Sequence, residues 1–160
     1  MKEETRIFFK KLSRIFILGL VIVCCDTLTT KGQCGEYNNS VGGELTCDGN
    51  SINEINGQGT WIIWGVGQDV TIQLKNGEGS LTLRNFKNIT IVEKNGKGNL
   101  IVEDDNESVK INKMDGEGSA YLRVKGTKRI GEKNGSGNIY FKGATPIIGN
   151  IKNGKVVREV

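Results

Sequence analysis

Apolar and polar residues alternate in two short segments of every repeat from residue 56 onward. Alternation with a period of two is typical of β-strands that bury one face, so the pattern predicts an all-β protein. In the first segment, the residues expected to face inward are Trp61, Ile63, Leu81, Leu83, Leu100, Val102, Ala120, Leu122, Ile139 and Phe141. In the second segment they are Val70, Ile72, Ile89, Ile91, Val109 and Ile111, followed with a weaker pattern by Lys128, Ile130, Ile147 and Gly149.

The repeats begin with a shared turn signal. An Asn or Asp followed by Gly-x-Gly opens five units, and a shorter Asn-Gly stub follows them; their first residues are Asn56, Asn76, Asn95, Asp115, Asn134 and Asn153. The period is 19 or 20 residues. Units of this length bury an apolar face only by stacking on their neighbours. Residues 56–160 are therefore predicted to form a β-solenoid (β-helix) of about five to six coils, with the Asn and Asp residues in one column.

An antiparallel β-meander or barrel is the alternative, in which each unit is one hairpin with Asn-Gly at its turn. The solenoid is favoured because a single apolar face per strand suits a narrow core that all coils share. Residues 33–55 are then expected to cap one end of the solenoid, and residues 155–160 the other end. Caps are expected because the open end of a stack is a template for aggregation.

The first 25 residues have the character of a secretory signal peptide. A basic start precedes an apolar run over residues 15–25, which is shorter than the roughly 20 residues of a transmembrane helix. Cleavage is expected after residue 25, or as late as residue 32. The alternative is a retained membrane anchor, including a lipid anchor on Cys24 or Cys25. The leader predicts a secreted protein that has no membrane contact after cleavage.

The net charge of the chain gives little support for an anionic partner. The formal charge of the chain is +4, and the leader contributes most of it, because five of its residues are basic and two are acidic. The mature domain is therefore close to neutral. A nucleic-acid partner, which would require a basic domain, is not expected.

Cysteine usage agrees with export. Cys34 and Cys47 remain after the leader and are predicted to form a disulfide in the N-terminal cap, which would stabilise the fold by about 3 kcal/mol. The mature sequence also contains four Asn-x-Ser/Thr tripeptides. In a eukaryotic source these are candidate glycosylation sites, at Asn38, Asn88, Asn106 and Asn134.

One unit carries a family resemblance. Residues 76–86, NGEGSLTLRNF, resemble a coil of the small pectate lyases, which are secreted parallel β-helices. That family also has an acidic cluster for calcium and a basic Lys/Arg catalytic pair flanked by cysteines. No match to the cysteine-flanked basic motif is present here. The resemblance therefore implies the β-helix and does not extend to the activity.

Candidate chemistry in the chain is sparse. The sequence contains no His, which excludes His-based catalytic triads and His-based zinc sites. The one dense acidic run, residues 103–107, offers oxygen ligands for Ca²⁺ but lacks the spacing of an EF-hand loop, so it is interpreted as a solvated corner. We expect no metal, no cofactor and no enzymatic activity. A polysaccharide lyase or hydrolase is the alternative.

The outward positions of the first strand of each unit are more informative. They form two predicted columns: Ile62, Thr82, Ile101, Tyr121 and Tyr140 in one, and Trp64, Arg84, Glu103, Arg123 and Lys142 in the other. Aromatic, apolar and basic side chains on one exposed face are typical of interaction sites. The predicted binding face comprises Ile62, Trp64, Tyr121, Arg123, Tyr140 and Lys142.

These observations favour a secreted binding protein, for example an effector, whose partner is an extracellular protein or a polysaccharide. Two alternatives concern the same features. Either the outer face is covered by another part of the chain, or the protein has a structural role and self-associates into fibres by end-to-end stacking of its coils.

Overall fold

The computed structural model describes residues 34–37 and 41–160, so the predicted signal peptide and Asn38 lie outside the described residues. All regular structure in the described part is β. The thirteen strands found there are β1 (Gly42–Thr46), β2 (Ser51–Ile55), β3 (Thr60–Trp64), β4 (Val70–Lys75), β5 (Leu81–Arg84), β6 (Asn88–Lys94), β7 (Leu100–Val102), β8 (Ser108–Met114), β9 (Ala120–Leu122), β10 (Lys128–Lys133), β11 (Ile139–Phe141), β12 (Ile147–Ile151) and β13 (Val156–Arg158).

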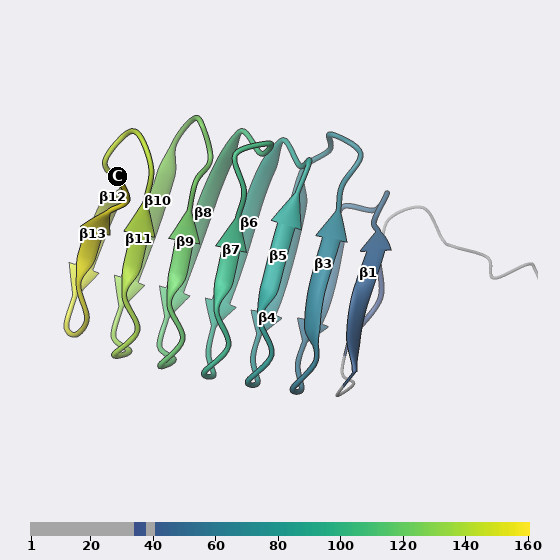
Figure 1. Ribbon diagram of the computed structural model, residues 1–160, viewed down its shortest axis with the longest axis horizontal. Helices are drawn as coiled ribbons and strands as arrows, with labels where there is room; N and C mark the ends of the chain where they lie inside the picture. The colour runs from purple at the N-terminus through teal and green to yellow at the C-terminus, as the bar shows by residue number, and fades with distance from the viewer. Residues whose placement is uncertain (1–33, 38–40) are drawn as a thin grey trace, which may run out of the picture. The chain divides into compact units, whose positions relative to one another are not determined.

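The strands form two parallel sheets. The odd sheet has the order β1-β3-β5-β7-β9-β11-β13, and the even sheet has the order β12-β10-β8-β6-β4-β2. Figure 1 shows the odd sheet as one layer and the even sheet as a second layer behind it. A meander would pair consecutive strands antiparallel, whereas each strand here pairs with the strand two positions along the chain. The chain is therefore a β-solenoid of about six turns, as predicted, and not a meander or barrel.

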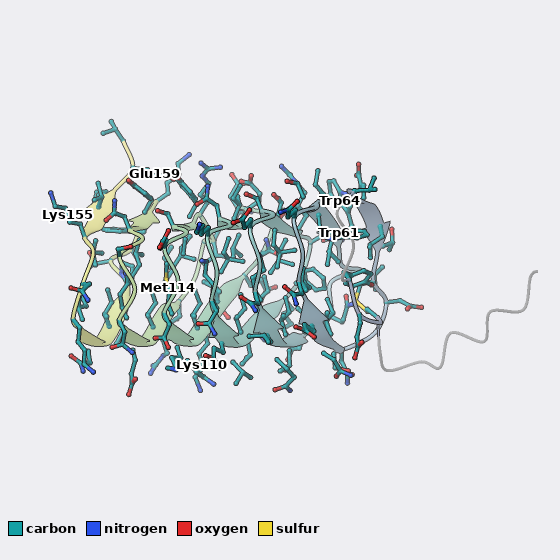
Figure 2. All side chains as sticks on the ribbon, turned by 90° about the horizontal axis from the view of Figure 1, so that it is seen from below. Trp61, Trp64, Lys110, Met114, Lys155 and Glu159 are labelled. Carbon is teal, nitrogen blue, oxygen red and sulfur yellow. A yellow bond between two sulfur atoms is a disulfide. The ribbon has the colours of Figure 1, made fainter. Side chains whose placement is uncertain are left out.

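The core lies between the two sheets, and the inward residues predicted for the first four turns are all buried. Figure 2 shows this arrangement in side view, with Met114 between the sheets, Trp64 on the outer side of the odd sheet and Lys110 on the outer side of the even sheet. The strand registers place equivalent residues of successive turns directly beside one another, for example Ile72, Ile91 and Ile111.

The last turn departs from the prediction. Ile147 pairs with outward Arg129 and is 56% exposed, and Gly149 is also exposed, whereas Ile148 pairs with Ile130 and faces the core. The connection from the end of β11 to Ile148 is one residue shorter than the connection from the end of β9 to Ile130, with which Ile148 pairs. Because side chains alternate along a strand, a shift of one residue reverses the face of each. The expectation that Ile147 and Gly149 point inward is therefore wrong.

The same shift displaces the last member of the turn column. In four earlier turns, the backbone N–H of the Asn or Asp donates to the end of the strand one turn before, as from Asn95 to the Lys75 carbonyl (2.8 Å). In the last turn, Lys152 makes this bond to Lys133 (2.8 Å). Lys152 therefore occupies the column position predicted for Asn153, whose amide nitrogen instead donates to the Asn134 carbonyl (2.9 Å).

The segment predicted to cap the N-terminal end belongs to the solenoid itself. Strands β1 and β2 pair in parallel with β3 and β4, and Tyr37 forms a β-bridge with Ile55. The Tyr37 ring also packs against the Trp61 ring, with 5.1 Å between centroids. Residues 155–160 likewise extend the odd sheet, because β13 pairs with β11. Within the described residues, no further strand pairs with the outer edges of β12 and β13.

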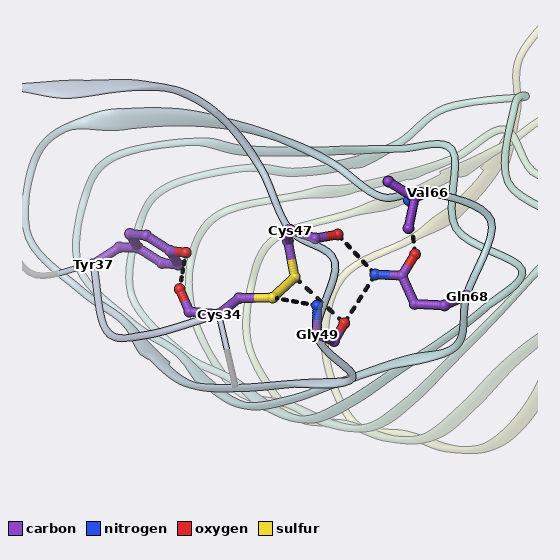
Figure 3. Close-up of a disulfide and its surroundings, with 6 residues drawn as sticks. All are labelled: Cys34, Tyr37, Cys47, Gly49, Val66 and Gln68. Atoms are coloured by element: carbon purple, nitrogen blue, oxygen red, sulfur yellow. Dashed lines mark hydrogen bonds between the residues drawn. A yellow bond between two sulfur atoms is a disulfide. The ribbon is translucent and has the colours of Figure 1, made fainter. Parts of the chain in front are cut away.

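The predicted disulfide between Cys34 and Cys47 is present in this first turn. Figure 3 shows the polar contacts that surround it. The backbone N–H of Gly49 donates to Cys34 Sγ (3.2 Å). The Gln68 side-chain amide donates to the carbonyls of Cys47 (2.7 Å) and Gly49 (2.8 Å). The disulfide closes the first turn, and the Gln68 side chain links that turn to the second.

Glycine is required at the Asn-Gly-x-Gly corners by the closeness of neighbouring backbones. A Cβ atom on Gly79 would lie 1.9 Å from the Gly59 carbonyl oxygen, and one on Gly118 would lie 2.2 Å from that of Gly98. The first glycine has a further reason, because Gly77 adopts a φ of 83°, which is disfavoured for residues with a side chain. The recurring glycines thus allow the turns to stack without an intervening layer of side chains.

A row of lysines is buried inside the solenoid next to these corners, which the alternation did not predict. Gln73 and Leu74 both face outward, so the strand bends and the next residue turns inward. The column formed by these residues consists of Ile55, Lys75, Lys94, Met114, Lys133 and Ile151. Its three lysines are each at most 1% exposed.

The buried ammonium groups are satisfied by backbone carbonyls. Lys75 Nζ donates to the Asn76 carbonyl (2.9 Å), Lys94 Nζ to the Gly118 carbonyl (2.9 Å), and Lys133 Nζ to the Gly135 carbonyl. Among the described residues, none of the three forms an ion pair with a carboxylate. Burial lowers the pKa of Lys75 to about 8. Burial, together with repulsion from Lys75 and Lys133, lowers the pKa of Lys94 to about 8.

We expect Gly118→Ala to lower the free energy of unfolding by about 1–3 kcal/mol, because the added Cβ overlaps the backbone of the preceding turn. Glu117→Ala is the matched control: Glu117 is exposed in the same corner, and its loss should change stability by less than about 0.5 kcal/mol. Urea denaturation followed by circular dichroism measures both. Equal effects of the two substitutions would show that the corner tolerates a side chain.

We expect Lys94→Met to raise the free energy of unfolding at pH 7 by about 1–3 kcal/mol, because it removes a buried charge from a column that already holds Met114. The unfolded amine titrates near 10.5 and the folded one near 8, so the wild type should gain stability as pH rises from 8 to 10.5. Lys94→Met should reduce that gain.

Lys110→Met serves as the control, because Lys110 is exposed on the even sheet. Denaturation curves at pH 7, 8.5 and 10 provide the comparison. A destabilised Lys94→Met protein with an unchanged pH profile would contradict the assignment of a costly buried charge.

Candidate functional site

The outer face of the odd sheet carries the predicted aromatic column. The register aligns Ile62, Thr82, Ile101, Tyr121 and Tyr140 across β3, β5, β7, β9 and β11. All five side chains are half-buried. The Tyr121 and Tyr140 rings are stacked, with centroids 4.8 Å apart and planes inclined by 11°. The predicted alignment is confirmed, while the binding role of this column stays a prediction.

A second column runs beside the first and is linked from turn to turn. The Arg84 guanidinium lies 5.1 Å from the centroid of the Trp64 ring, and the Trp64 indole N–H donates to Glu44 (2.5 Å). Arg84 also forms ion pairs with Glu103 (3.6 Å) and Asp105 (3.5 Å). Trp64 is thus held by contacts within the sheet.

Arg123 continues this column toward the C-terminal turns. It forms ion pairs with Glu103 (3.3 Å) and Glu159 (3.0 Å), so that Glu103 lies between two arginines. The hydrogen bonds that Arg123 donates to these two carboxylates, first of all to Glu159, raise the pKa of its guanidinium. Its charge is therefore compensated within the protein. Of the predicted face residues, Lys142 is exposed and the other five are half-buried.

The orientation of the tyrosines decides what the face offers to a ligand. Each of the two rings uses one flat side for the other ring, and the Arg123 guanidinium lies 5.8 Å from the Tyr121 centroid. The amide nitrogen of Asn138 donates to the Tyr140 hydroxyl (3.1 Å). The strip thus presents ring edges and hydroxyls on a rigid surface, and a large part of the flat ring area is already in contact with neighbours.

Several residues of the acidic run 103–107 make contacts within the protein. Glu103 and Asp105 pair with Arg84, and the Asn106 side chain is 1% exposed. Across residues 34–37 and 41–160, no group of three or more His, Cys, Asp or Glu side chains is placed to hold a metal ion. Glu103 and Asp105 of this run thus link neighbouring turns through Arg84.

Asn106, a predicted glycosylation site, has an internal role that the sequence did not reveal. Its Oδ1 accepts from the backbone N–H of Phe86 (2.8 Å), and its Nδ2 donates to the carbonyls of Leu83 (2.9 Å) and Glu103 (2.9 Å). A glycan would be attached to this same nitrogen. Because Asn106 lies in a polar run, the sequence suggested a loop position. The one sequence signal of an internal role was that Asn106 lies between two strand segments.

The other tripeptides lie nearer the surface. Asn88 and Asn134 are half-buried, and their amide nitrogens donate to Asp69 (2.8 Å) and Asp115 (2.9 Å) of the preceding turn. Glycosylation at these two positions stays a prediction.

Comparison of the chain with protein-family models, curated proteins and solved structures finds no match. In the part of the chain that the structure describes, no helix is long and apolar enough to cross a membrane.

We expect Asn106→Ala to lower the free energy of unfolding by about 2 kcal/mol, because it leaves the buried N–H of Phe86 without a partner and removes one of the two hydrogen bonds to the Leu83 carbonyl. Asn88→Ala, at a half-buried position, should have a smaller effect. Chemical denaturation measures both variants. Peptide mass spectrometry of the protein from a eukaryotic host should find Asn106 unmodified; a glycan there, or equal destabilisation by both substitutions, would refute the internal role.

Proposed function

We propose that this protein is a secreted, non-enzymatic binding protein that recognises a protein partner through the outer face of the odd sheet. The observation that carries the proposal is the stacked pair Tyr121 and Tyr140, aligned with Ile62, Thr82 and Ile101 in one half-buried strip. Aromatic residues dominate the energy of protein interfaces. A strip held in place by a sheet loses little conformational freedom on binding.

A protein partner suits this strip better than a polysaccharide. Sugars stack on the flat side of an aromatic ring, and here Tyr121 is covered by Tyr140 on one side and approached by Arg123. Ring edges and hydroxyls beside aliphatic side chains match the mixed surface of a protein. The paired charges of Arg84, Glu103 and Arg123 leave the border of the strip nearly neutral. A polysaccharide ligand is one of the outcomes that the test distinguishes.

The absence of His and the internal pairing of the acidic run support a non-enzymatic role. An acid pair for a glycosidase must face substrate across a cleft. Glu103 and Asp105 instead contact Arg84. Secretion is supported by the disulfide between Cys34 and Cys47, which is typical of oxidising compartments, together with the predicted leader.

We expect Tyr121→Ala combined with Tyr140→Ala to abolish partner capture while the β-sheet circular dichroism persists, because the strip loses its aromatic anchors and the core is untouched. The control is Thr90→Ala combined with Lys110→Ala, which alters the outer face of the even sheet. The chain, expressed with its leader and recovered from the medium, is used as bait against extracellular proteins and on a glycan array.

Capture that survives the tyrosine substitutions would overturn the proposed face. Binding to glycans alone would replace the protein partner by a polysaccharide. Depolymerisation of pectin or a related polymer, lost on Asp104→Ala with Asp105→Ala, would establish the enzyme alternative. Retention of the chain inside the producing cells would contradict secretion.

A further inference from the structure

Charge is segregated along the solenoid axis. Residues 34–120 contain seven basic and thirteen acidic residues, whereas residues 121–160 contain nine basic and two acidic residues. Because strand order in each sheet follows chain order, this asymmetry in sequence becomes an asymmetry in space. The turns from β9 onward are strongly basic, although the domain as a whole is nearly neutral. An anionic ligand would be attracted to these last turns.

A buried cation lies at one corner of the basic turns. Lys128, the first residue of β10, occupies the inward column in which the preceding turns hold Val70, Ile89 and Val109. It is 2% exposed. Its ammonium group donates to the Gly126 carbonyl over 3.4 Å, which is long for a hydrogen bond. Burial lowers the pKa of Lys128.

Lys128 also lines a depression in the surface. The depression has a volume of about 270 Å³ and lies between the loops that follow β9 and β11. Its other polar side chains are those of Lys125, Thr127 and Thr145, and its lining includes no acidic residue. Arg158 donates to Thr145 Oγ1 (3.4 Å), which places a third cation at its rim.

We propose that this depression binds a single tetrahedral oxyanion, a phosphate or sulfate group, with Lys128 and Lys125 as the charged donors and Thr127 and Thr145 as hydroxyl donors. A buried ammonium group is costly unless a counter-charge compensates it. Hydrogen bonds from ammonium groups to phosphate or sulfate are charge-assisted and strong. Lys94, in contrast, has a carbonyl acceptor at 2.9 Å beneath the glycine corner. The site is separate from the tyrosine strip and does not depend on the function proposed for it.

The test uses the full chain at constant ionic strength, with chloride replaced stepwise by inorganic phosphate or inorganic sulfate. The melting temperature of the wild type should rise and saturate with either anion. Lys128→Met should fold, since an apolar residue fills this column in earlier turns, but should bind phosphate at least about tenfold more weakly in calorimetric titration. Lys94→Met is the matched control, because it removes a buried lysine elsewhere and should retain the wild-type response.

Two further arms identify the source of the oxyanion. Heparin tests a group carried on a polysaccharide, and inorganic phosphate tests a free ion. Binding of either probe that is lost in Lys128→Met and kept in Lys94→Met supports the site. The proposal is overturned if phosphate and sulfate leave the melting temperature of the wild type unchanged, or if Lys128→Met responds as the wild type does.

Discussion

Direct contact between the backbones of successive turns is the constraint on which this protein depends. At the Asn-Gly-x-Gly corners a carbonyl oxygen lies where a Cβ of the next turn would be, as between Gly59 and Gly79. Such contact fixes the register, because a turn that slipped along its neighbour would bring a side chain to the corner. The register then places equivalent residues of successive turns in a column along the molecule. Core, outer face and buried charges are all consequences of these columns.

Each column places similar residues of successive turns beside one another. Whether their contact is favourable depends on the chemistry of the side chains. Tyr121 and Tyr140 gain a stacked contact. Arginines alternate with Glu103 and are linked through it from turn to turn. Lysines in the buried column have no such alternation: Lys75 and Lys94 are direct neighbours, and repulsion from Lys75 contributes to the lowered pKa of Lys94. Carbonyl groups of the corner stabilise these amines, and Met114 interrupts the row.

The two proposed sites follow from different properties of the same stack. The tyrosine strip depends on alternation within the strands of the odd sheet, which keeps Tyr121 and Tyr140 on the outer face. The oxyanion site depends on position along the axis, since basic residues are concentrated in the last turns and Lys128 occupies a core position beside a surface depression. A partner protein and an anionic group therefore have separate places to bind.

The sequence by itself determined the all-β fold, the stacked repeats, the disulfide and the alignment of the tyrosines, because each follows from short-range spacing. Tertiary structure alone decided three other features. Lys94 turns inward because the strand bends just before the corner, and Ile147 turns outward because the last turn pairs one residue out of step. Asn106 is buried because its side chain forms hydrogen bonds with the backbone N–H of Phe86 and with the carbonyls of Leu83 and Glu103. These outcomes depend on which backbone groups of the adjacent turn are available to pair, and one repeat considered alone carries no information on that choice.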